Sequence, residues 1–194
     1  MKYFDTNTFT KMNGSPGNNK PTQIFVHHSG GTDANPLADT SEHTAKGMEL
    51  WHLGKGWDGL GYHYVIHKNG DVWRGRPEHR NGAHAVGYNT KSIGICLAGN
   101  FDATLPTQAQ IESLKELMLE VKSRHDISAI RPHRSVANKT CYGNRLGDTW
   151  AADLLNDVPS TDQLGTCESE KAEIKKLKGQ VKLLVGYIIK LISK

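Results

Sequence analysis

The sequence predicts an α/β fold in which a mixed central β-sheet is flanked by helices. Short β-branched and aromatic runs alternate with stretches of helical periodicity along the chain. Two of these runs are joined by Asn69-Gly70, which readily takes the positive φ angles of a tight hairpin turn, so part of the sheet is antiparallel. Ser92 to Ala98 is apolar enough to be a buried central strand. With 194 residues, 37% hydrophobic and 23% charged, the chain has the size of one globular domain with an appendage.

The N-terminal third begins without a clear element. Residues 1–21 are polar and lack sustained periodicity, so we expect an arm without fixed structure. The first strand runs from Gln23 to His28 and ends at a Ser-Gly-Gly turn. In the loop that follows, Asp39 and Glu42 have the spacing of a capping box, which predicts a helix that runs to about Leu53.

The remaining elements of the domain, which we expect to span residues 22–158, follow in order. The hairpin strands cover residues 62–67 and 72–75. Thr107 and Gln110 form a second capping-box pattern and predict a helix. The apolar face of that helix would consist of Ile111, Leu114, Met118 and Val121. We expect a short strand over residues 129–131 and a last helix over residues 145–155.

The C-terminal segment has a different pattern. Residues 159–167 have the composition of a linker. Within residues 168–194, apolar side chains recur at alternating spacings of 3 and 4, as in a coiled-coil seam: Ile174, Leu177, Val181, Leu184, Ile188 and Leu191. This basic amphipathic helix could form a homo-oligomeric bundle, contact an anionic membrane or envelope, or dock on the domain. The regularity of the seam favours the bundle.

Charge and cysteine content exclude several classes of protein. The net charge is +4, and residues 168–194 carry all of it, with seven lysines and three glutamates. The remaining chain is neutral, so we expect no nucleic-acid partner. The sequence has no transmembrane run of about 18 apolar residues and no apolar leader typical of a secretory signal. Three cysteines do not make a disulfide framework, so we expect synthesis in a reducing cytoplasm.

Three places could carry chemistry. His27 and His28 end the first strand, where ligands of α/β sheets tend to bind, and strand alternation allows only one of them to serve a given site. His133 and Cys141 lie eight residues apart with Lys139 between them. Imidazole and thiolate are zinc ligands, and a nearby ammonium would stabilise a thiolate or developing charge, although an ordinary surface loop fits this spacing equally well.

The third place is a pair of glycine-flanked aromatic motifs. They are Gly61-Tyr62-His63 and Gly82-Ala83-His84, the second followed by Asn89. Glycines beside aromatic and histidine side chains suit a groove wall that a ligand approaches closely, although a packed core would look similar. Cys96, inside the central apolar run, is most simply a small buried hydrophobic residue.

Taken in order, these motifs resemble those of the zinc-dependent N-acetylmuramoyl-L-alanine amidases of the amidase-2 and peptidoglycan recognition protein superfamily, and most of all the lysozyme-type endolysins of phages. The resemblance covers residues 24–155 and includes Gly75-Arg76 and Ser92-Ile93-Gly94-Ile95. Many relatives have proline directly after the cysteine, whereas this chain has Tyr142.

The resemblance implies a role for each matching position. His27, His133 and Cys141 would bind Zn²⁺, and Tyr62 and Lys139 would be catalytic. We further expect His84, Asn89 and Arg76 in the substrate groove. Two imidazoles and one thiolate leave a fourth position for water, whose pKa the metal would lower. The resulting hydroxide would attack the amide between N-acetylmuramic acid and L-alanine, and Tyr62 and Lys139 would stabilise the oxyanion.

The implied function is therefore peptidoglycan hydrolysis, most simply by a phage endolysin made in the host cytoplasm and released to the cell wall at lysis. Two alternatives remain open. The first is a non-catalytic peptidoglycan-binding or regulatory protein on the same fold. The second is an intracellular amidase that recycles soluble muropeptides.

Overall fold

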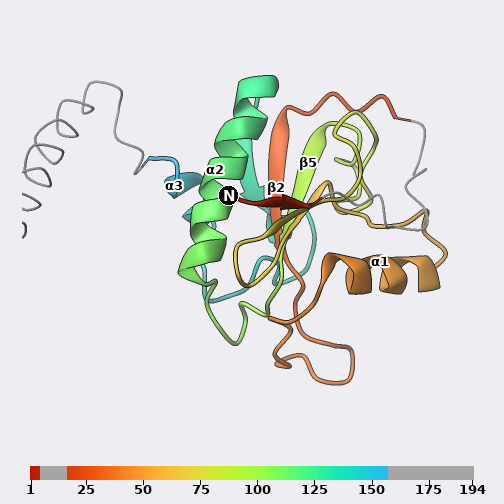
Figure 1. Cartoon of the computed structure of the whole chain (residues 1–194), viewed down its shortest axis with the longest axis vertical. Coiled ribbons are helices and arrows are strands. Elements are labelled where there is room, and N and C mark those ends of the chain that lie inside the picture. The colour runs from red at the N-terminus through yellow and green to blue at the C-terminus, as the bar shows by residue number, and fades with distance from the viewer. Residues whose placement is uncertain (5–16, 157–194) are drawn as a thin grey trace, which may run out of the picture. The chain divides into compact units, whose positions relative to one another are not determined.

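A computed structural model of the chain describes residues 1–4 and 17–156 (Figure 1). Its centre is a six-stranded sheet of order β1-β4-β3-β5-β2-β6. The strands are β1 (Tyr3–Phe4), β2 (Gln23–His28), β3 (Tyr64–Ile66), β4 (Val72–Arg74), β5 (Ser92–Leu97) and β6 (Ala129–Pro132). β3 and β4 pair antiparallel and every other neighbouring pair is parallel. The mixed sheet predicted from the sequence is confirmed.

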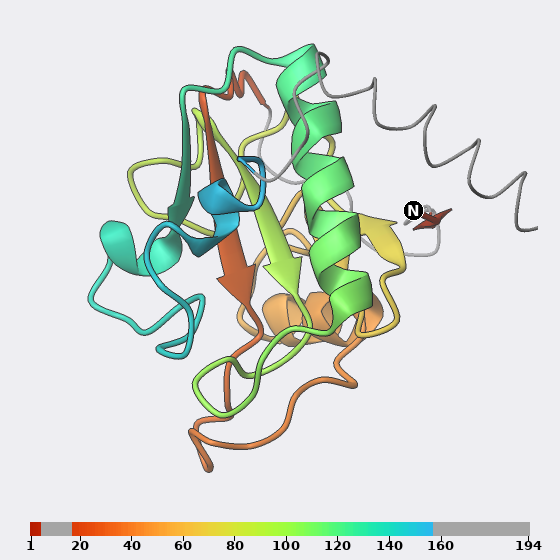
Figure 2. The same ribbon diagram turned by 90° about the vertical axis from the view of Figure 1, so that its left-hand side faces the viewer.

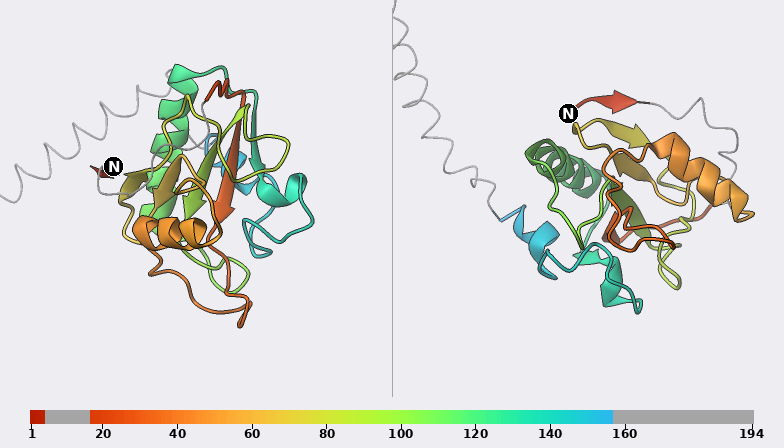
Figure 3. Two further views of the ribbon diagram at one scale, coloured as in Figure 1. Left: turned by 90° about the vertical axis from the view of Figure 1, so that its right-hand side faces the viewer. Right: turned by 90° about the horizontal axis from the view of Figure 1, so that it is seen from below.

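Helices cover both faces of this sheet. α1 (Ala45–Gly54) and α2 (Gln108–Arg124) lie on opposite sides of it, and the short α3 (Trp150–Asp153) follows at the end of the domain (Figures 2 and 3). Strand alternation divides the core accordingly. Ile93, Ile95 and Leu97 pack in the cluster that includes α2, whereas Cys96 packs in the cluster that includes α1. Because β5 is buried along its whole length, it is the central strand that its composition predicts.

The hairpin between β3 and β4 also forms as predicted, with shorter strands. Ile66 lies opposite Val72, and Gly70 is the turn residue with positive φ, at 86°. No other residue type takes a positive φ in the described ranges, so the turn depends on glycine for this conformation.

The expected start of α1 is wrong. The helix begins at Ala45, and Thr44 caps it by accepting a hydrogen bond from the Gly47 backbone N–H. Asp39 instead accepts from the Ser41 backbone and stabilises a turn. The Glu42 carboxylate accepts from Lys68 across the surface and does not reach back to a helix end. The Thr107 capping box of α2 is confirmed, with both reciprocal hydrogen bonds present.

Two further predictions about helices need correction. Ile111 is only partly buried, and Leu117 takes its place on the buried face of α2. The helix expected over residues 145–155 is reduced to the four residues of α3. The Leu146 carbonyl accepts from the Arg134 side chain, and the Asp148 carbonyl lies within hydrogen-bond distance of the Tyr142 hydroxyl. The Gly147 carbonyl accepts from the Trp150 backbone N–H, where α3 begins.

The N-terminal arm has more structure than expected. Tyr3–Phe4 adds an edge strand beside β4, and Asn19 is buried, with its amide donating to the Glu78 and Ser92 carbonyls. No helix in the described ranges is long and apolar enough to cross a membrane. The expected linker at 159–167 and helix at 168–194 lie outside the described residues.

Candidate metal centre and active site

Three side chains that are distant in the sequence meet at one end of the sheet. His27 lies near the carboxyl end of β2, His133 directly follows the neighbouring parallel strand β6, and Cys141 lies in the loop beyond. One ligand atom from each lies within 4.8 Å of the other two. His28, the other member of the pair, points to the opposite face, where its Nδ1 accepts from the Phe101 backbone N–H.

The geometry of this group fits a divalent metal ion. Cys141 Sγ lies 3.6 Å from His27 Nδ1. Tetrahedral zinc with ordinary Zn–S and Zn–N bonds separates its sulfur and nitrogen ligands by about 3.5 Å. Three protein donors leave a fourth position open, which is the pattern of catalytic rather than structural zinc sites.

The electrostatics of the group favour neutral imidazoles. Burial lowers the pKa of His27 well below its usual value, and the neighbouring histidines lower it further. Burial, followed by the charge of Lys139, lowers the pKa of His133. Both rings therefore present lone pairs at neutral pH. Burial raises the pKa of the Cys141 thiol to about 12, so a bound cation must displace the thiol proton.

Tyr62 and Lys139 stand beside the group in different environments. The Tyr62 ring centroid lies 5.1 Å from that of His27. Burial, with the thiols of Cys96 and Cys141, raises the pKa of Tyr62 well above its usual value, so its hydroxyl is a hydrogen-bond donor at neutral pH. Lys139 is exposed, and its charge acts on both histidines and the thiol.

A cavity of about 740 Å³ opens next to Tyr62, between the loop after β2 and helix α1. Its lining includes Ser29, Trp51 and His52. His52 Nδ1 accepts from the Gly61 backbone N–H, and burial lowers the His52 pKa to about 4, so the neutral ring carries its proton on Nε2. Trp51 is 55% exposed, which is unusual for so large an aromatic side chain.

Trp51 and His52 were not predicted to be site residues. An exposed tryptophan beside a histidine near a helix end was the available signal. The sequence alone does not show which face of α1 meets the sheet, so this pair could not be placed in the site.

The three residues expected in the substrate groove are not among those that line this cavity. His84 lies behind His27, with Nδ1 3.1 Å from His27 Nε2. Asn89 Oδ1 accepts from the backbone N–H groups of His84 and Ala85. Arg76 donates to the Leu60 and Asn81 carbonyls. Their polar atoms thus hold protein groups, and substrate contact by these residues stays a prediction.

Tyr142, the departure from the proline of many relatives, is fully buried. Its hydroxyl lies within hydrogen-bond distance of two loop carbonyls, at 2.8 and 2.9 Å, and its ring contacts Trp150 edge-on. The substitution therefore anchors the loop after Cys141 and leaves the three ligand side chains together.

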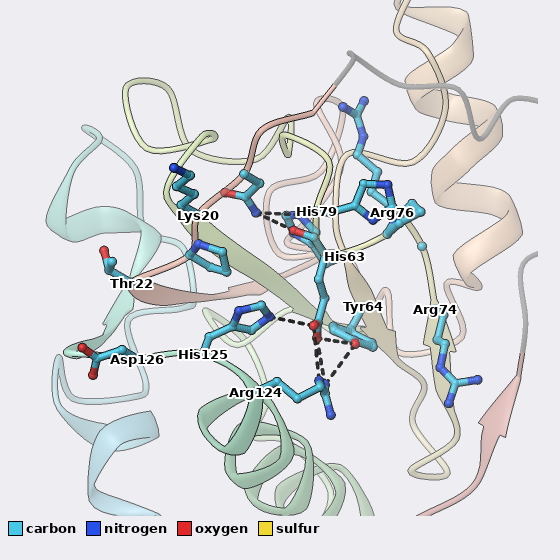
Figure 4. Close-up of a pocket in the computed structure, with 15 residues that line it drawn as sticks. Lys20, Thr22, His63, Tyr64, Arg74, Arg76, His79, Arg124, His125 and Asp126 are labelled. Atoms are coloured by element: carbon cyan, nitrogen blue, oxygen red, sulfur yellow. Dashed lines mark hydrogen bonds and ion pairs between the residues drawn. The ribbon is translucent and has the colours of Figure 1, made fainter.

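A second, larger cavity of about 960 Å³ lies at the other end of the sheet (Figure 4). It is bordered by Thr22, just before β2, and by Asp126, just before β6. The ligand candidates His27 and His133 lie at the opposite ends of the same two strands. Size alone therefore does not identify the reactive site.

Glu78 is the centre of a hydrogen-bond network in this second cavity. Its carboxylate accepts hydrogen bonds from Tyr64, Arg124 and His125 (Figure 4). Burial alone would raise the pKa of Glu78, but the hydrogen bonds from Arg124, Tyr64 and His125 outweigh it and lower the pKa to about 2. The network joins the end of α2 to the loop after β4.

This network predicts a loss of stability in acid. Because the folded-state pKa of Glu78 lies below its unfolded value, its contribution is present above about pH 4.5 and disappears as the pH falls toward 2. At pH 7, Glu78→Gln should lower the free energy of unfolding by about 1–2 kcal/mol, the scale of hydrogen bonds to a charged, partly exposed group. Denaturant unfolding measured across this pH range checks both points. The variant should lose less stability than the wild type between pH 5 and pH 2.5, and equal losses would contradict the assignment.

Comparison with known proteins agrees with the geometry. Residues 17–144 match the family model described as N-acetylmuramoyl-L-alanine amidase. The endolysin of Enterobacteria phage T3 is 36% identical over 138 residues, which cover 68% of this chain and 87% of that endolysin. The endolysin of Escherichia phage T7 is 35% identical, with the same coverage. An endolysin N-acetylmuramoyl-L-alanine amidase from Clostridium intestinale superposes with a TM-score of 0.69 at 30% identity, covering 80% of this chain and 95% of that one.

Fold and relatives together define a peptidoglycan amidase. The chain belongs to the N-acetylmuramoyl-L-alanine amidase family, and phage endolysins are among its relatives. The resemblance inferred from the motifs is thus confirmed for the family, the fold and the enzyme activity.

Proposed function

We propose that the chain is an endolysin that cleaves the amide bond between N-acetylmuramic acid and L-alanine in a bacterial host wall, with Zn²⁺ held by His27, His133 and Cys141. The observation that carries this proposal is the convergence of the three ligand atoms within 4.8 Å of one another. The similarity to phage endolysins supports synthesis in the host cytoplasm followed by action on the wall.

A bound zinc ion would supply a Lewis acid that acidifies a water molecule and polarises a carbonyl. The side chains around it have separate tasks. Tyr62 keeps its proton and donates a hydrogen bond to the amide carbonyl oxygen as negative charge develops there. The Lys139 ammonium adds a positive charge beside the same oxygen. These two groups stabilise the transition state more than the ground state, which is the requirement for catalysis.

The cavity beside Tyr62 is the proposed substrate groove. It is lined by Tyr62, whose ring packs against that of His27, and by the Trp51 and His52 side chains of α1. An exposed aromatic ring and a neutral imidazole N–H suit a polar polymer whose sugars and amides offer both apolar faces and hydrogen-bond acceptors.

The products of digestion test this function. Purified walls treated with the native protein should release N-terminal L-alanine without new reducing sugars, and a chelator should stop the release until zinc is added back. Reducing ends would instead indicate a glycosidase. Binding to walls without cleavage would favour the non-catalytic alternative. Cleavage of soluble muropeptides but not of intact sacculi would favour the recycling amidase.

For residues 168–194, outside the described part of the chain, we propose self-association into a helical bundle. The support is the six-residue apolar seam and the surplus of apolar side chains between Leu183 and Ile192. Deleting residues 168–194 should reduce the mass in solution from an oligomer to a monomer, measured by light scattering. A monomer both before and after deletion would end this proposal, and loss of binding to anionic vesicles on deletion would favour the membrane or envelope contact.

A further inference from the structure

A row of buried hydrogen-bonding groups extends away from His27, on the side opposite the other two ligand candidates. His27 Nε2 lies 3.1 Å from His84 Nδ1. On the far side of that second ring, His84 Nε2 lies 3.4 Å from Ser92 Oγ. The Ser92 hydroxyl donates to the Tyr88 carbonyl at 2.7 Å. His27, His84 and Ser92 are all buried, so water does not compete for these bonds.

When both rings are neutral, the hydrogen bonds of this row can have only one order of donors and acceptors. The Tyr88 carbonyl can only accept, so the single Ser92 hydroxyl proton points to it. Ser92 Oγ must then accept from His84 Nε2–H. A neutral imidazole has one N–H, which leaves His84 Nδ1 as an acceptor for His27 Nε2–H. His27 Nδ1 is therefore unprotonated, and this is the atom that lies 3.6 Å from Cys141 Sγ.

The His84 ring is held in a slot made by two glycines. A Cβ atom at Gly82 would come within 2.4 Å of the ring, and one at Gly94 within 2.5 Å. Neither position can carry a side chain unless the ring moves. Asn89 fixes the backbone of the same segment by accepting from His84 N and Ala85 N, both at 2.9 Å. The slot and the anchored backbone hold the plane of the ring, and the hydrogen bonds to His27 and Ser92 set which edge faces each partner.

We propose that His84 is a positioning residue that selects the Nε2–H tautomer of His27 and fixes its ring so that Nδ1 presents a lone pair to a metal ion, with Ser92 setting the direction. The inference rests on the metal centre of the proposed function. It explains the glycine-histidine motif at residues 82–84 and the Ser-Ile-Gly motif at residues 92–94 together, because both hold the His84 ring against His27. Partners of this kind behind a metal ligand typically change metal affinity 10–100-fold.

Nitrogen-15 NMR of the imidazoles in the metal-free full-length protein tests the direction without any activity measurement. The expected spectrum has His27 and His84 both protonated on Nε2. A His27 ring protonated on Nδ1 would overturn the proposal.

Titration of the metal-free protein with Co²⁺ and Zn²⁺ tests the consequence. His84→Leu removes the acceptor and should weaken metal binding about 10–100-fold. His84→Asn keeps an acceptor oxygen near the place of Nδ1 and should restore most of the affinity. The matched control is His63→Asn, because His63 is another buried histidine, in edge contact with His84 but outside the row, and the asparagine oxygen can still accept from the Gly94 backbone N–H. Circular dichroism and the thermal midpoint show which variants fold.

The outcomes separate the two proposals. If the wild type binds neither ion, the proposed metal centre fails. If the wild type binds and His84→Leu binds equally well, the positioning role fails while the metal centre stands. A loss of affinity in His63→Asn as large as in His84→Leu, or no recovery in His84→Asn, would show a packing effect and would also overturn the positioning role.

Discussion

Replacing Cys141 by serine is expected to remove the bound metal and abolish wall cleavage. A serine hydroxyl is a much weaker ligand than a thiolate for zinc, because its proton is far harder to displace and its oxygen is less polarisable. Mutating a residue that only hydrogen-bonds to a metal ligand typically costs about 10–100-fold in metal affinity. Loss of a ligand itself should cost more, so we expect zinc affinity to fall by at least about 100-fold. Metal content of the purified variant, measured together with L-alanine release, checks this expectation.

Cys96 provides the matched control for this experiment. It is a buried thiol on β5, opposite His27 in the strand register, but it is not a member of the three-residue group. Cys96→Ala should therefore keep its metal and lose about 1 kcal/mol of stability for a small buried truncation. Because the Cys96 thiol also interacts with Tyr62, metal content and not L-alanine release is the quantity compared. A Cys141→Ser variant that retained zinc at the wild-type level would remove Cys141 from the proposed ligand set.

Tyr62→Phe is expected to slow turnover about 100-fold or more while metal content stays unchanged. The substitution removes one hydroxyl that donates to the developing oxyanion, and removal of a single such donor typically reduces kcat by about 100- to 1,000-fold. Because the ring remains, its packing against His27, at 5.1 Å between centroids, should persist. Initial rates on purified walls, with zinc analysis of the same preparation, separate catalysis from metal binding.

Tyr88→Phe is the control for loss of a hydroxyl in the same domain. The Tyr88 ring packs edge-on against Phe25, away from the cavity beside Tyr62. This variant should keep the wild-type rate. A Tyr62→Phe enzyme with nearly unchanged kcat would exclude the Tyr62 hydroxyl from the mechanism.

Local chemistry made much of the fold predictable from sequence. Gly70 in the hairpin turn, the Thr107 capping box and the apolar run that became β5 each express a short-range preference that the structure retains. The family's motif spacing likewise singled out His27, His133 and Cys141, which the fold brings together.

What could not be predicted depends on partners distant in the sequence. α1 starts later than predicted: Thr44 caps it, and His67, next to the hairpin, accepts from the Ala45 backbone N–H. Before α3, the Leu146 carbonyl accepts from the distant Arg134 side chain, and the helix is shorter than its composition predicted. His84 was expected in the groove because its motif gives no sign that the ring would lie against His27. Each case is a competition between a local preference and a contact that exists only in the folded chain.

The position of β2 beside β6 has a consequence for the domain as a whole. His27 and Cys141 are 114 residues apart, so an ion shared between them closes a loop that contains most of the described chain. Closing so long a loop restricts the unfolded chain, and any ion that binds only the native state shifts the unfolding equilibrium by mass action. The same ion would therefore act as a reversible cross-link, and the melting temperature of the enzyme should report its zinc occupancy.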